Sequence, residues 1–424
     1  MSGLVKDNVF GSSGTVAAAA GGLSWDTAVV TGSTVTVEAG NGYFINTTSN
    51  ACTITLPSAA DAGDQIILID YLRTWGTNKI TIDSNGLTFQ GQEDTYIVDY
   101  DTAGQSINLV YADSTNGWIP TSDITNALEP VAPPTQKGIF AYGFTDAKVS
   151  MSNLISSSGV IATDVTGVGS DTAYLAAATY GGDKGIFAYG EQDAGVVNTK
   201  NLVNNSGVIA ATASGAGTAR SALAAAAYGV GLAILAYGDA SGLVTKSNLI
   251  TDQGVIGSDN SISGSGRRYN AAVGYGGDKA IFFGGRDGAS NRLNSKNLVS
   301  NVGVVAADAT DTGTARNNLA GTTYGSSNQA MFAYGYNGSA VVSLKNLVSS
   351  SGTIASDVTG VGTARQALAA TNYGGDKGAF AYGETTSVVS IKNLASNTGV
   401  IATDVTGVGT ARLYLAAAGY SISA

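Results

Sequence analysis

The side chains that carry most enzyme chemistry are scarce in this sequence. It contains no histidine and a single cysteine, Cys52. Without histidine the chain cannot build a Ser-His-Asp or Cys-His catalytic group or a histidine metal site, and one cysteine cannot form a zinc-binding cluster. The remaining possibility is carboxylate chemistry, because a pair of Asp or Glu side chains can hydrolyse a glycosidic bond.

The aspartates, however, recur instead of forming one unique pair. Four of them occupy equivalent places in Ala-X-Asp stretches: Asp164, Asp308, Asp357 and Asp404. Three more follow a Gly-Gly pair: Asp183, Asp278 and Asp376. Catalysis needs one site, whereas an aspartate that returns in every repeat suits a turn or a cap. We therefore predict no catalytic residue, no cofactor-binding residue and no metal ligand, and expect that the chain is not an enzyme.

An arginine recurs in the same way, at Arg220, Arg267, Arg316, Arg365 and Arg412, with Thr172 in that region of the first copy. A ring of arginines could bind an anion at a channel mouth. Alternatively, each could donate hydrogen bonds to backbone carbonyls between the neighbouring blades that the repeats are expected to form, and recurrence favours this structural role. Cys52 alternates in phase with Ile54 and Leu56, which predicts a buried, unreactive thiol.

These residues belong to a unit that occurs six times after Lys137, with starts 47 to 50 residues apart. Each copy opens with an apolar run: Gly138–Gly143, Gly185–Gly190, Ala233–Gly238, Ala280–Gly285, Ala330–Gly335 and Gly378–Gly383. An Asn-Leu pair follows, then a Gly-Val-Ile segment such as Gly159–Ala162, then Thr-Ala-Arg and an alanine-rich run. Four short strand signals in such a period predict a β-propeller blade.

The order of these segments predicts how the ring closes. The first copy lacks an alanine-rich strand before it, and the last copy ends in one, so we expect Arg412–Tyr420 to complete the first of six four-stranded blades. The alanine runs are too short for helices. We expect them to be the innermost strands, where only small side chains fit, joined to the next strand by tight Gly-Gly-Asp hairpins.

The first part of the chain lacks this period. Residues 1–24 form an N-terminal arm rich in Gly, Ala and Ser, and residues 25–120 are expected to form an antiparallel β-sandwich-like module. Its predicted strands are Ser33–Glu38, Gly42–Asn46, Cys52–Leu56, Gln65–Asp70, Lys79–Asp83, Thr95–Asp99 and Ser106–Tyr111. Residues 121–136 hold three of the five prolines and predict a stiff linker to the propeller at 137–424.

Composition removes two classes of partner. A net charge of −10 argues against binding nucleic acid, which needs clustered Lys and Arg. No run of 18 apolar residues occurs, so no membrane insertion is expected. The short run Val16–Ala20 does not suit a signal peptide.

Two parts of the sequence resemble known families. The order Thr-Ala-Arg, small apolar strand, Tyr-Gly-Gly-Asp-Lys, Ile-Phe-Ala-Tyr-Gly resembles the kelch motif over Lys137–Ala424, without the Tyr and Trp of its later strands. The repeats resemble more closely the kelch-like repeats carried in structural proteins of tailed bacteriophages. Asn46–Pro57, Ala62–Gln65 and Asn108–Ile119 resemble a small β module of phage fibre and appendage proteins.

The resemblance implies a non-enzymatic virion structural protein of the tail-fibre or receptor-binding type. Its N-terminal region would attach to other virion proteins and form a homo-oligomer, and its propeller would bind a host-surface glycan or protein. It would be made in the host cytoplasm without a signal peptide and reside in the extracellular particle. A head fibre or capsid decoration protein is an alternative, and a carbohydrate-active propeller enzyme is another.

Specificity is expected in the loops after the aromatic strands, which differ between copies and lie on one face. They are Phe144–Ala147, Glu191–Gly195, Asp239–Gly242, Arg286–Asn291, Tyr336–Ser339 and Glu384–Ser387. The candidate ligand- or receptor-binding residues among them are Phe144, Arg286, Asp287, Asn291, Tyr336 and Asn337.

Overall fold

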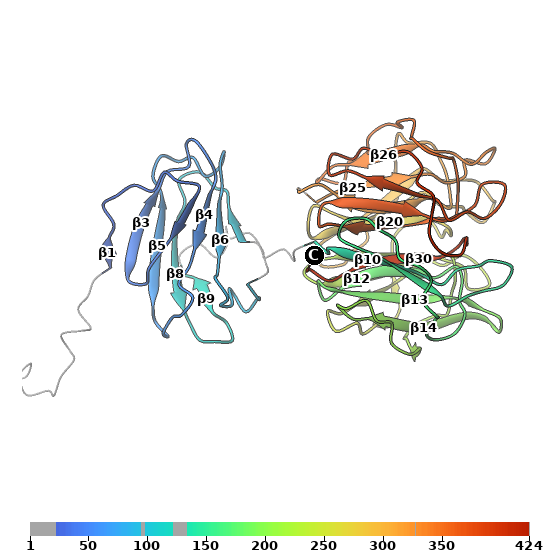
Figure 1. Cartoon of the computed structure of the whole chain (residues 1–424), viewed down its shortest axis with the longest axis horizontal. Helices are drawn as coiled ribbons and strands as arrows, with labels where there is room; N and C mark the ends of the chain where they lie inside the picture. The colour runs from blue at the N-terminus through green and yellow to red at the C-terminus, as the bar shows by residue number, and fades with distance from the viewer. Residues whose placement is uncertain (1–22, 95–97, 122–133, 327, 424) are drawn as a thin grey trace, which may run out of the picture. The chain divides into compact units, whose positions relative to one another are not determined.

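The computed structural model describes residues 23–94, 98–121, 134–326 and 328–423. All regular structure among these residues is β, as predicted, and no helix occurs among them. The chain divides into two compact units, Met1–Val131 and Ala132–Ala424 (Figure 1). The predicted arm at 1–24 and linker at 121–136 fall largely outside the described residues, as does the start of the predicted strand Thr95–Asp99.

Unit 1 consists of two sheets that enclose one core, seen as two layers of strands in Figure 1. The first sheet has the order β1 (Ser24–Trp25), β3 (Asn41–Ile45), β5 (Gln65–Asp70), β8 (Ser106–Tyr111), β9 (Trp118–Pro120). The second has the order β2 (Thr34–Thr36), β4 (Cys52–Thr55), β6 (Ile80–Asp83), β7 (Val98–Tyr100). Cys52 lies in the core between them, as predicted.

The prediction that unit 1 is antiparallel is wrong for four of its strand pairs. β1 with β3, β3 with β5, β2 with β4, and β4 with β6 are all parallel. The cause is the chain path: from β1 to β6, successive strands alternate between the two sheets. Each sheet therefore receives every second strand, and a chain that crosses over and returns enters in the same direction. The later pairs, such as β5 with β8, are antiparallel.

Unit 2 consists of six small antiparallel sheets. The first contains β11 (Ser152–Ile155), β10 (Lys137–Ala141) and β30 (Ala416–Tyr420). The second contains β12 (Ala176–Tyr180), β13 (Lys184–Gln192), β14 (Gly195–Val203) and β15 (Ala213–Ser214). The third contains β16 (Ala224–Tyr228), β17 (Leu232–Ala236), β18 (Lys246–Ile250) and β19 (Asn260–Ser261).

The remaining three sheets follow the same plan. The fourth contains β20 (Ala271–Tyr275), β21 (Lys279–Phe283), β22 (Ser295–Val299) and β23 (Ala309–Thr310). The fifth contains β24 (Ala320–Tyr324), β25 (Gln329–Ala333) and β26 (Lys345–Val348). The sixth contains β27 (Ala369–Tyr373), β28 (Lys377–Ala381) and β29 (Lys392–Ala395).

The predicted fourth strand of each repeat is misplaced. The Gly-Val-Ile segments pair with the third strand through a single residue, as in Ile155 with Ile161. Gly159, with φ of 81°, turns the chain there, and Val160 is 61% exposed. The outermost strand comes later and is short: two residues in β15, β19 and β23, and one bridge elsewhere, such as Lys345 with Val358. Six full four-stranded sheets are therefore not present.

Two other predictions about the repeats are confirmed. The C-terminal strand β30 pairs with β10, from Lys137 opposite Tyr420 to Ala141 opposite Ala416, and Figure 1 shows the two side by side. The Gly-Gly-Asp turns use positive φ, 58° at Gly181 and 77° at Gly182, which glycine adopts without a Cβ clash.

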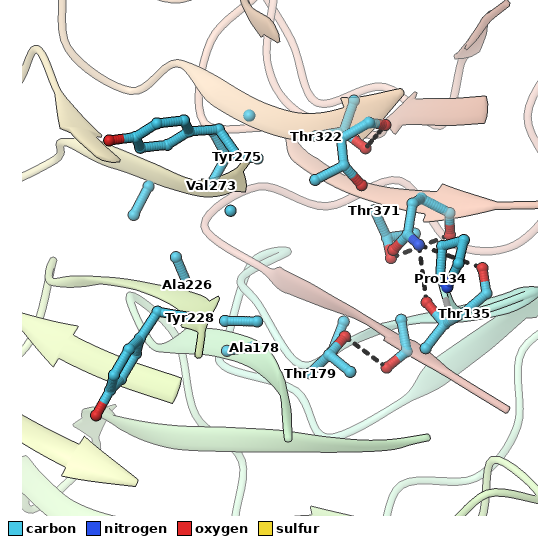
Figure 2. Close-up of a pocket in the computed structure, with 18 of the residues that line it drawn as sticks. Pro134, Thr135, Ala178, Thr179, Ala226, Tyr228, Val273, Tyr275, Thr322 and Thr371 are labelled. Carbon is cyan, nitrogen blue, oxygen red and sulfur yellow. Dashed lines mark hydrogen bonds between the residues drawn. The ribbon is translucent and has the colours of Figure 1, made fainter. Parts of the chain in front are cut away.

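The six alanine-rich strands contact one another in cyclic order. β12 contacts β16, followed by β20, β24, β27 and β30, and β30 contacts β12. They line a cavity of about 200 Å³, the hairpin-end cavity, whose wall is mostly Ala, Gly and Thr (Figure 2). Small residues such as Ala177, Ala227 and Ala417 line it, as the crowding explanation predicts.

The last residues of the predicted linker belong to unit 2. Pro134 and Thr135 line the hairpin-end cavity (Figure 2), and Asn372 Nδ2 donates to Thr135 Oγ1 at 2.8 Å. The backbone N–H of Gln136 donates to the carbonyl of Ser421 at 2.7 Å. Residues 134–136 are therefore held by the fold and do not act as a spacer.

The recurring arginines are completely buried, so they do not form an anion site at a channel mouth. Arg412 Nε donates to the carbonyl of Tyr142 at 2.9 Å, and its Nη2 donates to Asn153 Oδ1 at 2.8 Å. Both acceptors lie in the arginine's own sheet, so the prediction that these bonds link neighbouring blades is wrong. The neighbouring sheet is reached instead by the guanidinium face, 4.3 Å from the ring centre of Tyr382.

Candidate functional site

The six variable loops meet at one end of the alanine-rich strands. The first residue of each loop pairs with a residue just before one of those strands. The pairs are Phe144–Leu413, Glu191–Ala173, Asp239–Ser221, Arg286–Arg268, Tyr336–Asn317 and Glu384–Gln366. We call this end of unit 2, formed by the six loops and these partners, the loop face.

Three of the six predicted site residues hold the same position in different sheets. Phe144, Arg286 and Tyr336 each begin a loop, and each is half-buried. Their backbone N–H groups donate to the carbonyls of Leu413, Arg268 and Asn317 at 2.8 to 2.9 Å. The backbone thus fixes where these three side chains start on the loop face.

The other three predicted residues shape their own turns. Asp287 Oδ1 accepts from the backbone N–H of Asn291 at 2.8 Å, and Asn291 Nδ2 donates to Asp287 Oδ2 at 2.9 Å. These hydrogen bonds from Asn291 lower the pKa of Asp287. Asn337 Oδ1 accepts from the backbone of Ser339 and Ala340. The carboxylate of Asp287, Nδ2 of Asn291 and Oδ1 of Asn337 thus have partners within their own loops, which favours a structural role for these residues.

Closer to the centre lies a closed circuit of backbone hydrogen bonds. It joins one residue from each sheet: Tyr174, Ala222, Tyr269, Asn318, Ala367 and Tyr414. Each N–H donates to the carbonyl of another member at 2.8 to 3.0 Å, and the sixth bond returns to the first residue. All six have φ between 53° and 57°, the left-handed region that non-glycine residues seldom adopt.

Three members of this circuit are tyrosines whose rings cluster. The ring centres of Tyr174 and Tyr414 are 4.1 Å apart, and that of Tyr269 is 6.2 and 6.1 Å from them. Burial, followed by the charges of Tyr269, Glu191 and Glu384, raises the pKa of Tyr174 to about 12. Burial also raises the pKa of Tyr269 and Tyr414. All three hydroxyls therefore keep their protons at neutral pH.

The residues of the circuit and those that follow them line a cavity of about 110 Å³, which we call the axial pocket. The following residue is leucine in five sheets: Leu175, Leu223, Leu319, Leu368 and Leu415. In the fourth sheet it is Asn270, which is 7% exposed. Neither Oδ1 nor Nδ2 of Asn270 has a hydrogen-bond partner among the described residues. A buried amide in this state is unfavourable unless another molecule satisfies it.

Charged side chains surround the tyrosines. Glu384 accepts a hydrogen bond from Gln366 Nε2 at 3.0 Å, and Glu191 lies 3.5 Å from Lys148 Nζ. Arg268 pairs with Asp239 at 2.5 Å and lies 5.4 Å from the ring centre of Tyr269. No group of three or more Cys, Asp or Glu in the described ranges could hold a metal ion. The arrangement is suited to binding through aromatic rings and hydrogen bonds.

Sequence reasoning missed Tyr174, Tyr269, Tyr414 and Asn270. The sequence signal lies in the second and third residues after each repeated arginine, such as Ala222 and Leu223 after Arg220. They read Ala-Leu, Tyr-Asn, Asn-Leu, Ala-Leu and Tyr-Leu after Arg220, Arg267, Arg316, Arg365 and Arg412, and Tyr-Leu in the Thr172 copy. These two positions vary although the residues around them are similar in all copies. Such variation could have identified the centre of the loop face, as the variation of the long loops identified its outer part.

Within the part of the chain that the structure describes, no helix is long and apolar enough to cross a membrane. Neither protein-family models nor curated proteins give a match to this sequence.

Proposed function

We propose that unit 2 is a six-bladed β-propeller that the C-terminal strand closes. Six sheets of like order, cyclic contacts between their alanine-rich strands and the six-bond circuit support this. Lysines on the third strands add links between sheets: Lys345 Nζ donates to the carbonyl of Gly399 at 2.7 Å. Lys392 Nζ donates to that of Gly159 at 2.8 Å, which joins the sixth sheet to the first.

We infer that this propeller is the recognition head of a non-enzymatic virion protein of a tailed bacteriophage, of the tail-fibre or receptor-binding type. The observation that carries this is a repeated scaffold with six unlike loops and a pocket on the same face. The kelch-like order of the repeats and the fibre-like N-terminal module support the phage assignment by resemblance. In this proposal the loop face binds a host-surface glycan or protein.

Unit 1 has the features of an assembly module. Several outward positions of its first sheet are apolar, namely Phe44, Ile67, Ile69 and Val110, none of which belongs to the core. The polar residues beside them on this side, Gln65, Ser106 and Asn108, carry no charge. Trp25 stacks on Phe44 with ring centres 5.1 Å apart. The second sheet carries Thr and Asp on its outer side instead, such as Thr53, Thr81 and Asp99.

We propose that copies of this chain associate through the apolar side of the first sheet. A face without charge can pack on an identical face without opposing like charges, and exposed apolar patches commonly mark interfaces. The rest of the N-terminal region then attaches the oligomer to other virion proteins.

The particle itself tests the phage proposal. Phage particles that carry this chain should bind an antibody against unit 2 at the tail in electron micrographs, and the purified chain should reduce adsorption of those particles to host cells. Label on the capsid would favour a head fibre or decoration protein. Absence of the chain from purified particles would contradict the phage assignment, and glycan hydrolysis by the purified chain would contradict a non-enzymatic role.

Association has its own test. Ile67→Asp places a charge on the apolar face, so we expect it to lower the mass of the assembly in light scattering. Thr53→Asp makes a comparable change on the outer side of the second sheet and should leave the mass unchanged. Equal masses for wild type and Ile67→Asp would contradict association through this face.

A further inference from the structure

We propose that the axial pocket binds one neutral pyranose unit at the end of a glycan, with Asn270 hydrogen-bonding its hydroxyls and the three tyrosines contacting its ring. This deepens the proposed host-surface recognition and rests on it. The pocket is built from all six sheets, so its shape depends on the closed scaffold and not on any one loop.

Asn270 supplies the polar half of the site. Its five counterparts are leucines packed between sheets, for example Leu223 and Leu319, so the scaffold does not need an amide at this place. A buried amide without partners costs roughly 1–3 kcal/mol, and a ligand that satisfies it recovers this energy. A carboxamide offers donors and an acceptor side by side. Neighbouring hydroxyls of a sugar present the complementary pair.

The tyrosines supply the apolar half. Positive φ strains a bulky residue by roughly 1–2 kcal/mol, yet three of six positions in the circuit carry tyrosine and two carry alanine. Aromatic rings offer a broad, rigid surface that loses little conformational freedom on binding, suited to the C–H face of a sugar ring. Their protonated hydroxyls can add hydrogen-bond donors.

The volume of the axial pocket and the charges around it limit which ligands can bind. The pocket, at about 110 Å³, is well below the ~300 Å³ of the smaller pockets for drug-sized molecules, so it admits a single ring. Glu191 and Glu384 raise the pKa of Tyr174, whereas Arg268 and Arg286 act to lower that of Tyr269, so charges of both signs flank the pocket and neither sign dominates. A neutral terminal sugar fits these limits better than a sialic acid or a sugar phosphate.

The test measures binding of three probes to the full chain by saturation-transfer NMR. The probes are the methyl glycosides of glucose, galactose and N-acetylglucosamine. We expect at least one to bind, and Asn270→Leu to weaken it at least tenfold. This variant installs the residue of the other five sheets and removes an unsatisfied amide, so its melting temperature should stay equal or rise. Tyr414→Ala should also weaken binding. Thr323→Ala, in the wall of the hairpin-end cavity, is the matched control and should bind as wild type does.

Undiminished binding by Asn270→Leu, or no binding of any probe to the wild type, would overturn the sugar site. Neither result would overturn the phage proposal, because competition for host adsorption tests that separately. If the wild-type chain still blocks adsorption while no probe binds, recognition lies in the outer loops. If Asn270→Leu loses both probe binding and competition, the pocket is the receptor site.

Discussion

A buried arginine and a carboxylate accompany each other in five of the six sheets. In the fifth sheet Arg316 Nη1 lies 3.5 Å from Asp357 Oδ1. The second sheet replaces both, with Thr172 and Thr212, and Thr212 Oγ1 accepts from the backbone of Ser170 as Asp357 does from that of Thr314. A buried charge that loses its partner is strongly destabilising, so the two positions have to change together.

A double-mutant cycle on Arg316 and Asp357 checks this coupling. Arg316→Thr and Asp357→Thr should each destabilise unit 2, by about 3 kcal/mol for loss of one partner of a buried pair. The double variant has the two threonines of the second sheet. It should be more stable, by at least about 1 kcal/mol, than the sum of the two single-variant effects predicts. Urea unfolding followed by near-ultraviolet circular dichroism of the tyrosines measures it. Strict additivity would show that the pair is not coupled.

Cys52 provides a second expectation. Burial raises the pKa of its thiol to about 11, so almost no thiolate is present at neutral pH. We expect a thiol-specific reagent to leave the native chain unlabelled and to react fully once urea unfolds unit 1. Labelling at native conditions as fast as in urea would mean that the sheets of unit 1 open readily.

Among the elements, β30 connects the most distant parts of unit 2. It is a strand of the first sheet, and Arg412 and Thr410 fasten it to residues about 250 to 270 positions earlier, including Tyr142 and Asp164. Its side chains also line the hairpin-end cavity. Without β30, β10 would have an unpaired edge, and the set of five buried arginines would lose Arg412.

Deletion of residues 412–424 should therefore unfold unit 2 and spare unit 1. All three tryptophans, Trp25, Trp75 and Trp118, lie in unit 1, so tryptophan fluorescence reports on that unit alone. We expect native tryptophan emission together with loss of most of the tyrosine circular dichroism signal, because 15 of the 20 tyrosines lie in unit 2. Adding a synthetic peptide of residues 410–424 should restore that signal. Retention of the signal in the deleted chain would contradict a closing role for β30.

At the scale of the molecule, five carboxylates couple the stability of unit 2 to pH. Burial raises the pKa of Asp404, but hydrogen bonds from Thr363 and Asn393 and the charge of Arg365 outweigh it, so the net pKa is lowered. The pKa values of Asp164, Asp259, Asp308 and Asp357 are lowered in the same way. A lowered pKa in the folded state adds stability above the unfolded value, about 3.9, which is lost as pH falls through the folded value.

Asp404→Asn measures one such contribution. At pH 7 the wild type should be more stable than this variant, by about 1–3 kcal/mol for hydrogen bonds to a charged group. The difference should shrink below about pH 3, where the wild-type carboxyl also takes up a proton. Urea midpoints at the two pH values measure it. A difference that stays constant with pH would show that the charge of Asp404 does not contribute.

Much of unit 2 could be predicted because its repeats expose their own constraints. Alanine runs between turn residues indicated crowded strands, Gly181 and Gly182 indicated a tight turn, and the order of segments placed β30 beside β10. Asp259 was missed because Gly-Ser precedes it where other copies have Ala-X. The left-handed backbone at Tyr174 and Ala222 had no glycine to reveal it.

Unit 1 was less predictable for a physical reason. Alternation of side chains shows that a strand has a buried face, as at Ile66 and Leu68, but not which strand lies beside it. Parallel pairing depends on where the chain crosses between sheets, and no residue marks that crossing. Similarly, Val160 suits a strand by composition, yet it lies exposed in a turn because Gly159 redirects the chain.

The pairing of β10 with β30 determines when unit 2 can complete its folding during synthesis. The ribosome makes Lys137 some 280 residues before its partner Tyr420, and at ~5–20 residues per second this leaves a wait of roughly a quarter of a minute to a minute. During that interval the edge of β10 in the nascent polypeptide lacks its partner strand, and a chaperone could cover it. Products that terminate before Tyr420 would keep this unpaired edge and be open to proteases, so β10 gains its partner only after translation has passed β30.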